Sequence, residues 1–177
     1  MAMTLITTNA PSNATNSAFT SDIDSTYKLF IFKFLDINPA TDLAEFTFNG
    51  SIDGGSNYNV TKTTTWFRAY HQESGAGPAL GYDTAGDLPQ STAYQQLAED
   101  VGNGSDEGCA GTLWLFNPSS TTYVKHFYAT LNSLNGADSS YNHFISGYFN
   151  TTDNIDAIDF KFSSGNFDGT IKMYGVG

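Results

Sequence analysis

The sequence predicts an all-β chain: a single antiparallel β-sandwich, with the connectivity of a jelly roll and an extended N-terminal arm. Eight or nine short stretches have strand character, clusters of turn-forming residues separate them, and none shows clear helical periodicity. The 177 residues suit one domain, and a chain of this length buries enough surface to fold without disulfides or metals. We therefore expect an arm at residues 1–25 and one sandwich domain at residues 26–177.

The first 25 residues are mostly short and polar, with brief apolar interruptions. A terminal segment of this kind is mobile unless something holds it. Two contacts could order this segment: pairing with the edge of the domain's own sheet, or binding to a neighbouring subunit. We favour the neighbouring subunit.

The next segment, residues 27–35, is apolar on both alternating faces of a strand. Leu29, Ile31 and Leu35 share one face, and three phenylalanines share the other. This pattern predicts a strand covered on both sides, either in the centre of the sandwich or under a partner. The candidate interface residues are Leu5, Ile6, Phe19, Phe30, Phe32 and Phe34.

Turns and strands alternate through the middle of the chain. A Pro-containing turn at residues 38–42 precedes an alternating strand at 44–52, and a Gly-rich turn at 53–57 follows it. Residues 60–70 are rich in Thr and aromatic side chains, which favour strands. Residues 72–90 are polar and contain Gly and Pro, so we expect an exposed loop.

The C-terminal half continues in the same way, after one ambiguous stretch. Residues 91–101 fit helical spacing at three positions, but their neighbours are strands, so we predict strand or irregular structure. A turn at 103–108 follows. The remaining predicted strands are residues 112–116, 122–131, 141–149, 155–162 and 170–174.

Charge and hydropathy exclude several classes of partner. Eighteen Asp and Glu against seven Lys and Arg give a net charge of −11, and the pI is about 4.2. Nucleic-acid binding and docking on anionic membranes both need clustered basic residues, so we expect neither. No apolar run is long enough to span a membrane, and the N-terminal residues lack the pattern of a signal peptide. We expect a chain that does not use the ordinary secretory route.

Metal and cofactor sites are not predicted. Cys109 is the only cysteine, has no partner for an internal disulfide, and is expected to be buried and inert. His71, His126 and His143 have no metal-ligand spacing, although His126 and His143 could meet across strands. Residues 53–59 resemble a calcium loop only in composition, and the EF-hand pattern is absent, so we expect turns and solvated charge.

Catalytic motifs are also missing from the sequence. It contains no nucleophile elbow, P-loop, dinucleotide-binding fingerprint or zinc-protease motif. Carboxylate pairs for glycoside hydrolysis are available, as they are in almost any acidic chain. We predict a protein that is not an enzyme, with a polysaccharide hydrolase as the weakest alternative.

Aromatic side chains are the strongest remaining signal. They fill a sandwich core, or they stack on sugar rings and pack at protein interfaces. Those in question are Trp66, Phe67, Tyr70, Tyr82, Tyr94, Trp114, Tyr123, Tyr128, Tyr141 and Tyr148. The candidate ligand-stacking residues are Trp66, Tyr70 and Tyr82.

Three stretches carry a resemblance to a known group of proteins. The first is DSTY at 24–27 with NPATD at 38–42 ahead of an F-x-F strand. The second joins Gly102-Asn103 to GTLWLFNPSS at 111–120, and the third is the ending FSSGN at 162–166 with GTIKMYG at 169–175. Together they make the chain resemble small virion proteins of tailed phages, notably marine ones, over most of its length.

The resemblance implies a β-sandwich structural protein of the virion surface, made in the host cytoplasm and attached to the capsid or the tail. The resemblance does not say which. We favour a capsid decoration or cement protein over a tail accessory, because 177 residues without a long shaft or coiled coil are few for a fibre. A tail-borne adhesin or carbohydrate-binding module is the alternative. The implied partners are further copies in a homo-oligomer, expected to be a trimer, other virion proteins, and, for the alternative, a host surface glycan. The shared motifs are turns and strands, so no catalytic residues follow from it.

Overall fold

Antiparallel strands are the only regular elements in the part of the chain that the structure describes. The structure is a computed structural model, and it describes residues 2–177. The strands are β1 (Met3–Asn9), β2 (Ser17–Phe19), β3 (Leu29–Pro39), β4 (Ala44–Ser51), β5 (Lys62–Gln72), β6 (Ala79–Tyr82), β7 (Gln95–Val101), β8 (Gly108–Phe116), β9 (Lys125–Asn135), β10 (Ser139–Phe149), β11 (Ala157–Phe162) and β12 (Phe167–Val176). The predicted all-β class is confirmed.

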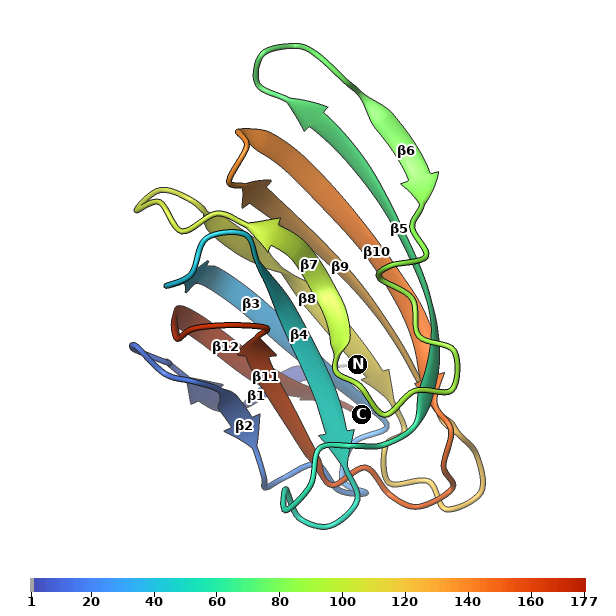
Figure 1. Cartoon of the computed structure of the whole chain (residues 1–177). Helices are drawn as coiled ribbons and strands as arrows, with labels where there is room; N and C mark the ends of the chain where they lie inside the picture. The colour runs from blue at the N-terminus through green and yellow to red at the C-terminus, as the bar shows by residue number, and fades with distance from the viewer. Residues whose placement is uncertain (1) are drawn as a thin grey trace.

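The strands form one antiparallel sheet with two rows. The long row runs β1-β12-β3-β8-β9-β10-β5-β6, and the short row runs β7-β4-β11-β2. The rows join where β7 pairs with β9 through one residue pair, Val101 with Asn135. In Figure 1 the short row lies in front of the long row, so that the sheet is nearly closed into a barrel-like shape.

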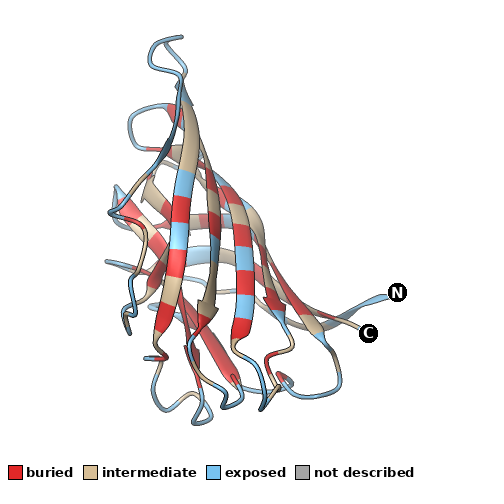
Figure 2. Cartoon of the chain, turned by 90° about the vertical axis from the view of Figure 1, so that its right-hand side faces the viewer, coloured by how far each residue is buried: buried red, intermediate tan, exposed pale blue. Residues whose placement is uncertain are grey.

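The N-terminal segment lies on the edges of the chain's own sheet. β1 pairs with β12, which places Met3 opposite Val176, and β2 pairs with β11. Between them, Ala14 forms a bridge with Phe167. The two chain ends therefore lie side by side, as Figure 2 shows. The sequence left open whether the chain's own sheet or a neighbouring subunit orders the N-terminal segment. In the structure the segment pairs with the edges of its own sheet.

Most predicted strands are present, with shifted ends. The ambiguous stretch at 91–101 contains β7, and the predicted loop at 72–90 contains the short, fully exposed β6. The β5–β6 hairpin projects beyond the other strands at the top of Figure 1. The predicted strand at 27–35 is β3, which continues through Pro39 and into the predicted turn.

Phenylalanine rings from both rows fill the space between them. Phe160 of β11 packs against Phe32 and Phe34 of β3, with ring centroids 5.3 and 5.1 Å apart. Phe34 also meets Phe46 of β4 at 5.3 Å, edge to face. Edge-to-face and tilted pairs of this kind add to the free energy gained by burying the rings. Since one residue pair joins the described strands of the two rows, this packing is a large part of what holds them together.

The core explains why four of the predicted interface residues are not at the surface. Phe19, Phe30, Phe32 and Phe34 are 3%, 0%, 0% and 2% exposed. They point between the rows, so the prediction that they face a partner is wrong. Periodicity identifies a buried face, but it does not tell whether the same chain or another one covers it.

Two lysines are buried at the ends of strands. Lys62 of β5 and Lys125 of β9 are both fully buried. The Lys62 Nζ donates to the carbonyl oxygen of Ala93, and the Lys125 Nζ donates to the carbonyl oxygens of Tyr123 and Thr151. Burial lowers the pKa of Lys62 from 10.5 to about 7, because the charged ammonium loses its hydration. Each ammonium ties a loop to a strand end.

Replacing Phe160 with Ala should lower the free energy of unfolding by about 3–5 kcal/mol, because the cavity would lie where both rows meet. Guanidinium denaturation measures this loss. Tyr123→Ala is the matched control: its ring is 70% exposed, and the change should stay within about 0.5 kcal/mol. Equal losses in the two variants would contradict the central place given to Phe160.

Stability should rise with pH between about 7 and 9. In that range the unfolded chain keeps the Lys62 proton, whereas the folded chain, with its pKa lowered to about 7, releases it. The free energy of unfolding then increases by up to about 1.4 kcal/mol per pH unit. Lys62→Met should flatten this slope in denaturation measured across the range, and Lys28→Met, at an exposed position, should leave it unchanged. An unchanged slope in Lys62→Met would contradict the assignment.

Candidate functional site

The outer face of the long row, turned away from the core, carries a continuous set of aromatic and hydroxyl side chains. Buried and exposed residues alternate along its strands in Figure 2. The strand register places Trp114 of β8 beside Tyr128 of β9, and Tyr128 beside Ser146 of β10. At the neighbouring outward-facing position of β10, Phe144 lies beside Phe67 of β5. Residues far apart in the sequence thus form one surface.

Three pairs of aromatic rings on this face are stacked. The centroids of Trp114 and Tyr128 are 4.3 Å apart with an interplanar angle of 17°, and Phe116 stacks on the same tyrosine at 5.8 Å. Phe67 and Phe144 stack at 4.8 Å and 10°. Cross-strand aromatic pairs stabilise a sheet. Here they also leave rings at the surface, since Phe67, Phe116 and Tyr128 are 40%, 37% and 42% exposed.

Two adjoining hollows lie on this face. The first has a volume of about 400 Å³, and the second, over Phe67 and Phe144, has about 290 Å³. They share Tyr128 and Ser146. The first is lined by Thr63, Thr64, Thr65, Phe116, His126, Phe127, Tyr128, Ser146, Gly147 and Tyr148. Among the described residues that line the two hollows there is no Asp, Glu, Lys or Arg, in a chain whose net charge is −11.

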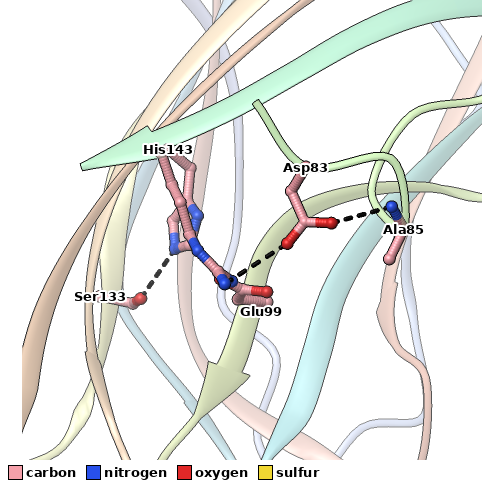
Figure 3. A network of polar contacts seen from close by, with 6 residues as sticks. Asp83, Ala85, Glu99, Ser133 and His143 are labelled. Atoms are coloured by element: carbon pink, nitrogen blue, oxygen red, sulfur yellow. Dashed lines mark hydrogen bonds and ion pairs between the residues drawn. The ribbon is translucent and has the colours of Figure 1, made fainter. Parts of the chain in front are cut away.

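A separate polar network lies on the inner side of β5, around Arg68, the only arginine of the chain. Its guanidinium pairs with Glu99 of β7 and lies 3.4 Å from the carboxylate of Asp83. It also lies over the rings of Tyr70 and Tyr141, at 5.7 and 5.2 Å. Asp83 in turn accepts a hydrogen bond from a backbone N–H of its own loop (Figure 3). The network attaches this loop and β7 to the long row close to the single β7–β9 pairing.

The histidines are placed separately. His143 is fully buried, and its Nε2 lies 3.0 Å from the Ser133 hydroxyl, as Figure 3 shows. Burial, together with the nearby Arg68, lowers the pKa of His143 to about 3, so its ring is neutral at physiological pH. His126 lies on the outer face opposite Tyr148, and the register pairs His143 with Leu131. The two histidines therefore do not meet.

The predicted ligand-stacking residues are only partly at the surface. Trp66 is fully buried, because the loop after β6 crosses its indole at Gly86, where a Cβ atom would come within 2.6 Å of the ring. The prediction that Trp66 stacks on a ligand is therefore wrong. Tyr70 is half-buried beside Arg68, and Tyr82 is 55% exposed on β6. Tyr82 donates its hydroxyl to Asp87.

The surface rings that matter most were not selected from the sequence. Trp114 and Tyr128 were only part of the aromatic surplus, and Phe116 and Phe144 were not singled out. The sequence did contain one relevant pattern: Trp114 and Phe116 alternate with Leu113 and Leu115, which are buried, so the two pairs point to opposite faces of the strand. Both parities of β8 are apolar, so the sequence did not show which one faces outward.

Asp53, in the Gly-rich turn that resembles a calcium loop, binds within its own loop. Asp53 accepts hydrogen bonds from the Ser51 hydroxyl and from the backbone and side chain of Asn57, and these bonds lower its pKa to about 2. Within residues 2–177, no three side chains among His, Cys, Asp and Glu gather as a metal site would require. Cys109 is buried as predicted, and burial raises the pKa of its thiol.

Comparison with known proteins gives no relative. No protein-family model, no curated protein and no solved structure matches the chain. The resemblance to phage virion proteins therefore stays a prediction. In the described chain, no helix has the length and apolar character needed to cross a membrane.

Proposed function

We propose that the chain is a non-enzymatic structural protein of the surface of a tailed-phage virion, and that it assembles with further copies of itself through the β1 edge of the sheet. A capsid decoration or cement protein is favoured over a tail accessory. The observation that carries the proposal is the unprotected edge strand β1, which pairs with β12 on one side and with no described strand on the other.

The composition of β1 supports assembly at this edge. Sheet edges that stay solvent-exposed are usually blunted by Lys, by Pro or by very short strands. β1 is seven residues long, contains no charged residue and no Pro, and exposes Met3 and Leu5 by 47% and 50%. Leu5 was predicted as an interface residue, and its neighbour Ile6 packs partly against the chain's own core. A second copy would satisfy the backbone groups of β1 and cover both exposed side chains.

The strand order supports a sandwich of the jelly-roll type. Four strands of the long row, β1-β12-β3-β8, face the four of the short row, β2-β11-β4-β7. The chain passes from one row to the other at every connection except β5–β6, β8–β9 and β9–β10, and the strands β9, β10, β5 and β6 extend the long row. Jelly rolls are frequent in viral capsid proteins and lectins, which fits a virion role by analogy of fold alone.

The alternative function is a tail-borne adhesin or carbohydrate-binding module. The projecting β5–β6 hairpin and the hollows beside it favour this alternative, because both offer aromatic rings away from the β1 edge. The two functions place the protein differently on the particle, so localisation separates them.

The full-length chain should sediment as a homo-oligomer, with a trimer of the 19.1 kDa chain as the expected mass. Leu5→Asp should give monomers, because a carboxylate would then be buried at each contact. Leu80→Asp on the other edge strand, at a position 72% exposed, should leave the mass unchanged. Circular dichroism shows whether both variants fold. A folded Leu5→Asp protein with the mass of the wild type would contradict assembly through β1.

Immunogold labelling of intact particles from the source phage tests the virion assignment. Gold over the heads is the expected result for a decoration or cement protein. Gold on the tails would favour the adhesin instead. Particles without this protein, shown by mass spectrometry of purified virions, would contradict both.

A further inference from the structure

The larger of the two adjoining hollows has the composition of a sugar site. Four aromatic side chains line it: Tyr128 stacks with Phe116, and His126 lies beside Tyr148 in the strand register. The floor carries hydroxyl groups, since the Oγ1 of Thr65 and the Oγ of Ser146 lie 2.8 Å apart. Small-molecule sites are typically lined by apolar and aromatic groups with a few polar ones, and have volumes of about 300–1,000 Å³. The hollow, at about 400 Å³, falls within this range.

The aromatic rings and the hydroxyl groups of the hollow match the two chemical parts of a pyranose, its apolar C–H face and its polar hydroxyl rim. The C–H face of the sugar packs on the face of an aromatic ring, where apolar contact is favourable. The hydroxyl groups at its rim need partners that both donate and accept, which Thr65, Ser146 and an imidazole provide. The Thr65 and Ser146 hydroxyls bond to each other and keep a further donor and further acceptor sites, which a purely hydrophobic partner would leave unused. The mixture therefore favours a sugar over an apolar protein segment.

The charges restrict the sugar to a neutral one. An acidic sugar needs Lys or Arg to pair with its carboxylate, and the described lining of the two hollows contains neither. The net charge of −11 would also repel an anion. A neutral sugar needs no cationic partner and is not repelled by the negative charge of the protein.

The second hollow extends the site along the sheet. It adds the stacked pair Phe67 and Phe144 and shares Tyr128 and Ser146 with the first. Tyr128 and Ser146, which are paired in the strand register, thus join the two sets of rings. The arrangement suits two or more linked sugar units rather than a single one.

We propose that the two hollows form one groove that binds a neutral oligosaccharide, with Phe116, Tyr128 and Phe67 as stacking platforms and Thr65 and Ser146 as hydrogen-bonding partners. The groove lies on β8, β9, β10 and β5, across β12 and β3 from the β1 edge. Sugar binding and assembly therefore use separate parts of the molecule. The inference deepens the carbohydrate-binding alternative and does not depend on the β1 contact.

Isothermal titration with maltotriose, cellotriose and chitotriose, each to about 10 mM, tests the groove, because single sites of this kind bind weakly. At least one of the three should bind the full chain, and 3′-sialyllactose, which is anionic, should not. Tyr128→Ala and Phe116→Ala should each weaken binding at least about tenfold. Tyr123→Ala, an exposed ring outside the groove, is the matched control and should bind as the wild type does.

Three results would overturn the inference: no binding of any neutral probe, undiminished binding by folded Tyr128→Ala and Phe116→Ala variants, or a preference for sialyllactose. Leu5→Asp separates this test from that of assembly. It should bind the sugar normally, whatever its oligomeric state. Failure of the groove and failure of the β1 contact are then distinguishable.

Discussion

The packing of phenylalanine rings between the two rows of strands is the interaction on which the rest of the structure depends. The rows share one backbone pairing, Val101 with Asn135, so hydrogen bonds alone do not fix their relation. Phe160 contacts rings of β3 in the opposite row and, with centroids 6.1 Å apart, Phe46 beside it in its own row. The side-chain period of a strand is two, so committing one face to this core commits the other face to the surface.

This separation of an inner, core-forming face from an outer face determines which parts of the sheet can bind a partner. The outward side chains of the long row contribute nothing to the aromatic core, and they are free to carry rings and hydroxyl groups that serve a partner. β1, at the end of the same row, leaves its own backbone groups unpaired by any described strand. One sheet thus offers two separate surfaces, an edge suited to assembly and a groove suited to a neutral ligand. The Arg68 ion pairs connect β5 to β7 and to Asp83, which lies in the loop that crosses Trp66 at Gly86.

The sequence predicted local structure well and orientation poorly. The alternation in β11 and β12 was visible because apolar and polar residues take turns there, and the burial of Cys109 followed from its small neighbours. In β3 and β8 both parities are apolar, so the sequence did not show that Phe30, Phe32 and Phe34 face inward or that Trp114 and Phe116 face outward. Trp66 was expected at the surface as part of the aromatic surplus, and the sequence did not show that the loop at Gly86 covers it. In each case the side that a residue faces depends on contacts with segments far away in the sequence.

Hydroxyl-radical footprinting of the assembled protein tests most directly the claim that the β1 edge assembles while the groove stays open. Leu5 and Leu43 are each 50% exposed in the single chain, which makes them a matched pair. The account predicts that Leu5 is far less modified than Leu43, while Tyr128 and Phe67 react as their exposure allows. Equal modification of the two leucines, or protection of Tyr128 and Phe67 in place of Leu5, would contradict it.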